Sequence, residues 1–349
     1  MKKVLALALA TLMMAGILTG CGGSGEKQRV VNVCSWGEYI DTDLITQFEN
    51  ETGIKVNYQI AESNEALYSL LKSGGADFDV IVPSDYMIAR LIAEDMLAEL
   101  NYDNIPNYAK IDEAYKNLSY DPENKYTVPY TWGTLGIIYN SAMVDEEITS
   151  WGAMFDEKYA GNVLLIGNSR DAFAMGLFYL GYDVNTTDEA QLRECAAKLM
   201  EQKPVVQQYV MDQIFDSMEN EEAWIAPYYA GDYLTMAEEN PDLKFYRPAH
   251  QGFNIFIDAM CIPTCCKEKE AAELFINFLC DPEISGQNMD YLGYSVPASA
   301  SKAYMDPAVT EDPVAYPSSD MLEKATSFNF LPEETARLME SLFMEARNS

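Results

Sequence analysis

The sequence predicts a two-lobed α/β fold, in which each lobe is a mainly parallel β-sheet flanked by helices and a ligand cleft lies between the lobes. Apolar β segments alternate with amphipathic helical segments through the first hundred residues, and a second alternation follows an extended segment over 128–140. Strand–helix–strand repetition favours parallel sheets that are covered on both faces. Two such lobes joined by extended crossovers enclose a cleft, which is a common place for a ligand.

The first lobe is expected to begin with three strands and three helices in alternation. The strand segments are 29–36 (RVVNVCSW), 54–61 (IKVNYQIA) and 78–83 (FDVIVP), and the helical segments are 42–53, 63–75 and 85–97. Leu44, Ile45 and Phe48 share one face of the first helix, which indicates an amphipathic helix packed on a sheet. Gly53 is a typical C-terminal stop for this helix, and Ser63 is a typical N-cap for the next.

The second alternation follows the extended segment 128–140. A turn and helix are expected over 150–161, strands at 162–167 and 222–229, a helix over 169–182, and two strands within 244–263. Further helices are expected over 267–281, where Pro282 interrupts the pattern, and over 332–347. We assign residues 29–133 with 258–302 to the first lobe, and residues 134–257 with 303–349 to the second.

The N-terminus has the pattern of a secretory signal that leads to a lipid anchor. Two lysines precede an apolar run over 4–17, and small residues join it to LTGC, which ends at Cys21 and looks like a bacterial lipobox. The run is too short for a stable membrane span. We expect residues 1–20 to be a signal peptide, Cys21 to be lipidated, and residues 21–28 to be a flexible tether on the outer face of the cell membrane. The alternative is an ordinary cleaved signal with a chance cysteine.

The charge balance argues against several classes of partner. The chain has 55 acidic and 23 basic residues, a formal net charge of −32. This excess argues against nucleic acid and against a polybasic membrane contact. The single histidine, His250, argues against a Ser-His-Asp triad and against an HExxH zinc site. We expect no cofactor and no metal.

The cysteines give no disulfide framework. Three of them lie in apolar runs and are expected to pack as small hydrophobic side chains: Cys34, Cys261 and Cys280. The spacing of the other three leaves a disulfide open: Cys195, Cys265 and Cys266.

Polar and aromatic residues follow the first three predicted strands. These segments are 36–39 (WGEY), 62–65 (ESNE) and 84–86 (SDY). The carboxyl ends of parallel strands meet at one edge of a sheet, where ligands bind. Aromatic rings and carboxylates suit a cationic amine with an apolar methylene stem. Asp258, within the apolar segment FNIFIDAMCIP, must be paired or face the cleft, because burial of an isolated carboxylate is prohibitive.

From about Val30 to the C-terminus, the chain resembles the spermidine/putrescine-binding proteins of bacterial ABC transporters, which have a periplasmic-binding-protein type II fold. The resemblance depends on an ordered set of motifs that includes SWGEYI, QFENETGIKVNY, FDVIVPSDYMIARL, VPYTWGTLGIIYN and LGYSVP. It implies a monomeric, extracytoplasmic binding protein without enzymatic activity. Such a protein closes over a polyamine and delivers it to a permease driven by a cytoplasmic ATPase.

The resemblance also implies which residues bind the ligand. They are Trp36, Glu38, Tyr39, Ser84, Tyr86, Asn168, Asp171, Tyr229, Phe256, Asp258, Tyr294 and Asn329. Four of these depart from the usual family pattern. Asn168 stands where a second acid is common, Tyr229 and Phe256 stand where tryptophan is common, and Asn329 replaces a glutamine. The lost carboxylate leaves the choice between a diamine and a triamine open.

Two other functions are considered. One is a binding protein for another small cation, such as agmatine or a basic amino acid. The other is a secreted hydrolase that uses two carboxylates, as glycosidases do. The two-lobed plan and the lack of a further catalytic motif argue against the hydrolase.

Overall fold

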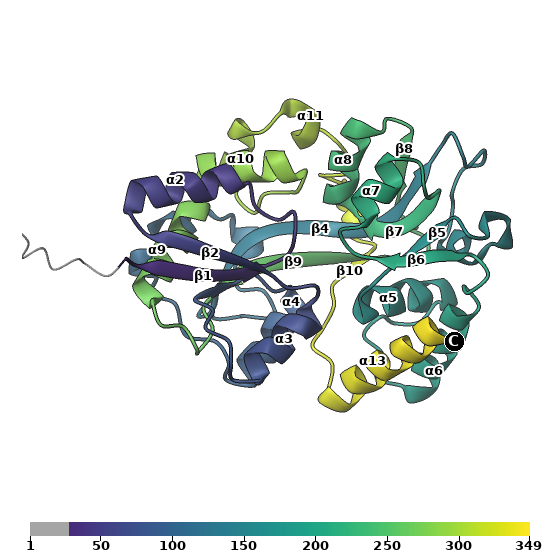
Figure 1. Cartoon of the computed structure of the whole chain (residues 1–349), viewed down its shortest axis with the longest axis horizontal. Coiled ribbons are helices and arrows are strands. Elements are labelled where there is room, and N and C mark those ends of the chain that lie inside the picture. Colours follow the sequence, from purple (N-terminus) through teal and green to yellow (C-terminus); the bar gives the residue numbers. More distant parts are fainter. Residues whose placement is uncertain (1–27) are drawn as a thin grey trace, which may run out of the picture.

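Residues 28–349 are described by a computed structural model of the chain, shown in Figure 1. The predicted signal peptide 1–20, Cys21 and the rest of the predicted tether up to residue 27 lie outside the described residues. In the described part, ten strands form one continuous mixed sheet in the order β2-β1-β3-β9-β4-β7-β5-β6, with β10 paired to β9 and β8 paired to β4.

The strands are β1 (Val30–Ser35), β2 (Lys55–Ile60), β3 (Val80–Ile81), β4 (Thr127–Asn140), β5 (Val163–Ile166), β6 (Val206–Val210), β7 (Ile225–Tyr229), β8 (Leu243–Tyr246), β9 (Phe253–Cys261) and β10 (Ala325–Thr326). The helices are α2 (Thr42–Thr52), α3 (Asn64–Lys72), α4 (Asp85–Ala93), α5 (Ser169–Leu180), α6 (Glu189–Met200), α7 (Ile214–Glu219), α8 (Ala230–Glu239), α9 (Lys269–Leu279), α10 (Pro282–Leu292), α11 (Pro307–Thr310), α12 (Ser319–Leu322) and α13 (Glu333–Asn348).

Two long antiparallel strands, β4 and β9, run through the middle of the sheet (Figure 1). The first half of β4 pairs with β9, from Thr127 opposite Cys261 to Thr134 opposite Ile255. The second half of β4 pairs with β7 and β8. Parallel pairs flank this centre on both sides, β1 with β2 and β3, and β5 with β6 and β7. Each half of the sheet is therefore mainly parallel, and the two central strands connect the halves.

The apolar cores form three clusters, two around β1–β3 and one around β5–β7. Around β1–β3, one cluster lies under α2, α9 and α10 and includes Phe48 and Phe275. A second cluster on the opposite face of the same strands lies under α3 and α4 and includes Leu67. A third cluster, around β5–β7, gathers α5, α6 and α13 and includes Phe173. Helices thus cover both faces of the sheet, and the predicted α/β class is confirmed.

Most predicted elements occur at the expected places, but several observed elements were not predicted, among them α7, α8 and β10. The helix predicted within 150–161 is wrong, because the segment forms two 3₁₀ turns, Trp151–Phe155 and Glu157–Tyr159. Pro282 was predicted only to end the preceding helix, but it is also the first residue of a second helix, α10. The fixed backbone angle of proline suits this first position. The strand β6 was not predicted, because its sequence VQQYV is short and has two adjacent glutamines.

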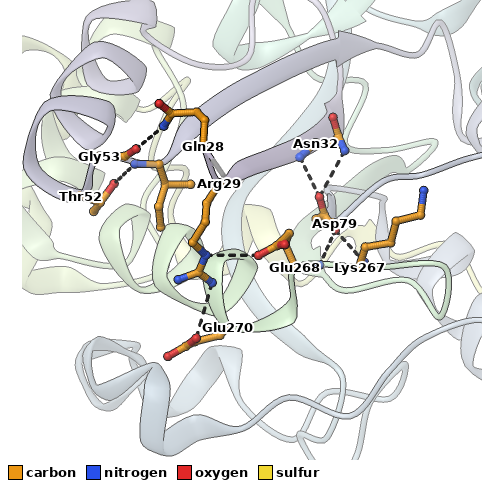
Figure 2. A network of polar contacts seen from close by, with 10 residues as sticks. Gln28, Arg29, Asn32, Thr52, Gly53, Asp79, Lys267, Glu268 and Glu270 are labelled. Carbon is orange, nitrogen blue, oxygen red and sulfur yellow. Dashed lines mark hydrogen bonds and ion pairs between the residues drawn. The ribbon is translucent and has the colours of Figure 1, made fainter. Parts of the chain in front are cut away.

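The start of β1 is fastened to its lobe by the polar network in Figure 2. Arg29 Nε lies 3.2 Å from Glu268 Oε2. Asp79 accepts hydrogen bonds from the backbone N–H groups of Asn32 at 2.9 Å, Lys267 at 2.9 Å and Glu268 at 3.0 Å. One carboxylate thus joins β1 to the loop before α9. From this network, β1 leads toward Trp36 and the cavity described below.

All six cysteines in the described residues are free thiols, and those predicted to pack as apolar side chains are buried: Cys34, Cys261 and Cys280. Within residues 28–349, no helix combines the length and the apolar character that crossing a bilayer requires.

Candidate binding site

A cavity of about 490 Å³ lies where the predicted strand ends meet. The segments 36–39, 62–65 and 84–86 all contribute to its lining, as their positions after β1, β2 and β3 predict. Asn64 Nδ2 donates a 3.0 Å hydrogen bond to Ser84 Oγ and so joins the second segment to the third. Eleven of the twelve predicted ligand-binding residues line the cavity: Trp36, Glu38, Tyr39, Ser84, Tyr86, Asn168, Asp171, Tyr229, Phe256, Asp258 and Tyr294.

Asp258 is the most buried of the predicted carboxylates, with 3% of its surface exposed. It lies in β9, one of the two strands that connect the lobes. Its Oδ2 accepts hydrogen bonds from Trp36 Nε1 at 3.1 Å and from the Tyr39 hydroxyl at 2.7 Å. Its Oδ1 is buried and has no hydrogen-bond partner among residues 28–349. Burial raises the pKa of Asp258 to about 6, against the lowering effect of the side chains of Tyr39, Ser84 and Trp36. A buried carboxylate oxygen without a donor can accept a charge-assisted hydrogen bond from a cation.

Asp171 lies in the first turn of α5 and belongs to a second polar group of the cavity. Its Oδ2 accepts hydrogen bonds from the Tyr229 hydroxyl and from Asn168 Nδ2, both at 2.7 Å. Asn168 is also the N-cap of α5, since its Oδ1 accepts from the Asp171 N–H at 2.8 Å. Burial raises the pKa of Asp171, and these two side-chain hydrogen bonds oppose the shift. The asparagine therefore caps the helix and orients the neighbouring carboxylate.

Aromatic rings pack edge to face along the cavity. The ring centroids of Tyr39 and Tyr294 are 5.6 Å apart with an interplanar angle of 77°, and those of Tyr229 and Phe256 are 5.4 Å apart at 72°. The ring centroids of Phe256 and Tyr294 are 6.4 Å apart, so the four rings form one connected wall. Such a wall offers apolar surface to methylene groups and ring faces to cations.

Carboxylates far outnumber basic groups in the lining. Eight residues contribute them: Glu38, Glu62, Glu65, Asp85, Asp171, Asp212, Asp232 and Asp258, whereas Arg347 is the only basic residue in the part of the lining that residues 28–349 form. Asp212 and Asp232 were not predicted. Asp212 follows the unpredicted strand β6, and Asp232 lies in the first turn of α8 after β7. The strand-end argument applied to β6 and β7 would have found both.

Asn329 does not line the cavity. Its backbone N–H donates a 2.8 Å hydrogen bond to Asn185 Oδ1, and its side chain is exposed, while the preceding Phe328 contributes to the lining. Arg170 lies near this segment, with its guanidinium 4.4 Å from the Phe328 ring centroid. It donates to the Val184 carbonyl at 2.9 Å and forms no ion pair with Asp171 or with any other described carboxylate. Arg170 is thus a buried cation close to, but outside, the cavity lining.

The family described as bacterial extracellular solute-binding protein matches residues 43–317. The chain belongs to this family. It is 30% identical over 338 residues to spermidine/putrescine-binding periplasmic protein 1 of Haemophilus influenzae, with 93% of each chain covered. It is 32% identical over 292 residues to the spermidine/putrescine-binding periplasmic protein of Escherichia coli, with 83% of each covered. A solved structure from Listeria monocytogenes, described as a spermidine/putrescine ABC transporter, is 37% identical in sequence to this chain, and the two structures superpose with a TM-score of 0.89. The match covers 92% of this chain and 99% of the Listeria chain.

These findings confirm the resemblance that the sequence motifs indicated. Extracellular solute-binding proteins are extracytoplasmic transporter components and not enzymes, so the hydrolase alternative is not supported.

Proposed function

We propose that this solute-binding protein captures a polyamine, spermidine or putrescine, and delivers it to an ABC permease driven by a cytoplasmic ATPase. The observation that carries the proposal is the cavity lining, which among the described residues contains eight carboxyl groups, several aromatic rings and one arginine. This combination suits a thin cation with separated ammonium groups and poorly suits an anion. The names of the relatives support the same ligand class.

The geometry suggests a role for each part of the cavity. Asp258 Oδ1, which has no partner, is the acceptor for one ammonium group. Asp171 is the acceptor for another, with its orientation held by Tyr229 and Asn168. The connected rings of Tyr39 and its neighbours contact the methylene groups between them. Closure of the lobes about the β4–β9 connection would then exclude water and strengthen the charge interactions.

We further propose that the protein is a monomer anchored to the membrane through lipidated Cys21. The LTGC motif supports this anchor. Intact mass spectrometry of protein from cells should show a diacylglycerol adduct that Cys21→Ala removes. A Cys21→Ala protein that differs from the wild-type protein only by the mass of the cysteine-to-alanine change would contradict the anchor.

Thermal melting and calorimetry with putrescine and with spermidine test the ligand class. Either amine should raise the melting temperature, because a ligand that binds only the folded state stabilises it. Asp258→Asn keeps an acceptor for Trp36 and Tyr39 but removes the charge, and it should weaken binding at least about 100-fold. No effect of any amine at millimolar concentration, together with stabilisation by an anion, would overturn the proposal. Tighter binding of agmatine or lysine would assign the site to another cation.

Asp121→Asn is a matched control for Asp258→Asn. Asp121 is equally buried, but it accepts hydrogen bonds from the N–H groups of Lys125 and Tyr126 and from the Thr127 hydroxyl, outside the cavity. This variant should lower the melting temperature and leave the amine affinity unchanged.

A further inference from the structure

Asp85 is a cavity-lining carboxyl group that has no assigned role. It is the first residue of α4, and 5% of its surface is exposed. Its Oδ1 accepts a 2.7 Å hydrogen bond from the Tyr86 N–H. An acid in a first turn stabilises a helix through the helix dipole, but Asp43 in α2 occupies such a position while it remains exposed. A helix-stabilising role therefore does not account for the burial of Asp85.

The backbone holds Asp85 beside Asp258. Ser84, its preceding residue, pairs with Asp258 in an antiparallel bridge. The Ala259 N–H donates a 3.1 Å hydrogen bond to the Pro83 carbonyl and fixes the start of α4 against β9. Both carboxyl groups line the same cavity, and Asp258 contributes its partnerless Oδ1. Two acids are thus buried next to each other without a basic residue between them in the lining.

Neighbouring buried carboxyl groups do not both ionise readily without a cation. Burial raises the pKa of Asp85 to about 8, and the charge of Asp258 adds to the shift. The backbone N–H groups of Tyr86 and of Ile257 in β9, and the charge of Arg170 in α5, oppose it. Asp85 also interacts electrostatically with Tyr120, which lies in the segment before β4. Arg170 interacts in the same way with Glu65 of α3 and Asp171 of α5. With this pKa, a protonated Asp85 is the favoured form of the ligand-free protein at neutral pH.

We propose that Asp85 and Asp258 form a two-carboxyl subsite for one ammonium group, and that the arriving cation displaces a proton from Asp85. The inference rests on the proposed function, because it requires an amine ligand. In this step the O–H bond of the Asp85 carboxyl group breaks, and the proton passes to water. The carboxylate so formed accepts a charge-assisted hydrogen bond from the ammonium group, and no electrons are transferred.

Calorimetry in two buffers of different ionisation enthalpy counts the protons released when putrescine or spermidine binds. At pH 7, Asp85→Asn should release up to about one proton fewer per ligand than the wild-type protein. Between pH 6 and pH 8, the affinity of the wild-type protein should rise more steeply than that of Asp85→Asn, by up to about tenfold per pH unit. Asp43→Asn is the matched control, since it removes an exposed first-turn acid, and it should keep the wild-type proton count.

Equal proton release by the wild-type protein and by a folded Asp85→Asn variant overturns the subsite. If Asp85→Asn does not fold, infrared difference spectra of the Asp232→Asn variant, recorded with and without amine, test the subsite instead. Burial raises the pKa of Asp232 to about 8, as it does for Asp85, so this variant removes the carboxyl group whose signal would overlap with that of Asp85. Loss of a protonated-carboxyl band on amine binding supports the subsite, and an unchanged band overturns it. Absence of any amine binding by the wild-type protein instead contradicts the proposed function itself.

Discussion

The hydroxyl of Tyr229 donates a 2.7 Å hydrogen bond to Asp171 Oδ2, and the same oxygen also accepts from Asn168 Nδ2. Two donors on one oxygen hold the carboxylate in a single orientation. Among the described residues, no hydrogen bond occupies Asp171 Oδ1. The arrangement parallels that of Asp258, where Trp36 and Tyr39 share Oδ2 and Oδ1 is left without a partner. Each carboxylate that we propose as an ammonium acceptor thus has one oxygen held by neighbouring donors and one oxygen without a hydrogen bond from the described residues.

Removal of the Tyr229 hydroxyl should weaken ligand binding. Tyr229→Phe keeps the ring beside Phe256 but loses a hydrogen bond to a charged group, an interaction of about 1.5–3 kcal/mol. We expect a loss of affinity of about tenfold for putrescine or spermidine in calorimetry. Tyr182→Phe removes an exposed hydroxyl that donates to Glu194 at 2.8 Å, and it should bind as the wild-type protein does. Equal affinities of the two variants would contradict a role of the Tyr229 hydroxyl.

Restoration of the missing carboxylate should change the preference between amines. Asn168→Asp places a second acid beside Asp171, with a cavity position for a further ammonium group. We expect spermidine to gain about tenfold in affinity relative to putrescine, because a triamine has one more charge to pair. The ligand-free variant should melt at a lower temperature, since the two acids repel each other. Asn168→Ser, which keeps an N-cap without charge, separates the effect of capping from that of charge. An unchanged affinity ratio would show that this position does not select between amines.

The buried acid Asp232 should make the stability of the ligand-free protein depend on pH. Burial raises its pKa from its ordinary value of 3.8 to about 8, and a hydrogen bond from Tyr294 opposes the shift. A raised folded-state pKa stabilises the fold at low pH, and this contribution is lost as the pH rises from about 4 through about 8. The melting temperature of the wild-type protein should therefore fall relative to that of Asp232→Asn between pH 5 and pH 8.5. Asp43→Asn changes an exposed acid, so its melting temperature should depend on pH as that of the wild-type protein does. If the melting temperature of Asp232→Asn also depends on pH as that of the wild-type protein does, the raised pKa of Asp232 is refuted.

Gly231 provides space for the Tyr294 ring of the cavity wall. A Cβ atom at this position would lie 2.3 Å from Tyr294 Cδ2, so the ring would have to move. We expect Gly231→Ala to destabilise the protein by about 1–3 kcal/mol and to weaken amine binding, because overpacking displaces the wall. Gly75→Ala is the control, since its nearest atom, Ser73 Oγ, lies 3.8 Å away. Denaturant unfolding and calorimetry of both variants test this, and wild-type behaviour of Gly231→Ala would contradict it.

The sequence was most informative where local patterns decide structure. Ser63 caps α3 and Gly53 ends α2 in the left-handed conformation, as predicted, because these features depend on a few adjacent residues. The two-residue strand β3, shorter than the predicted segment 78–83, shows that pairing with β1 and β9 sets strand length. The antiparallel insertion of β9 beside β3 depends on contacts between distant segments, which periodicity does not show.

The site was predictable to the extent that strand ends and family motifs reveal it. Trp36, Tyr86 and Asp258 come from well-marked strands and line the cavity. Asp212 was missed because β6, before it, has no clear apolar alternation. Asn329 was misplaced because it lies in a segment without regular structure, where the position of each side chain depends on tertiary contacts such as that with Asn185.

The apolar cores interleave along the chain. The core around β5–β7 uses residues from Leu135 to Phe253 and then from Phe328 to Ala346, and the cores around β1–β3 use residues up to Tyr130 and again from Phe256 to Met305. A single proteolytic cut therefore cannot release either lobe as a fragment with a complete interior. Heat should melt the whole protein in one cooperative transition, and split-protein reporters would need both fragments present before either half becomes folded.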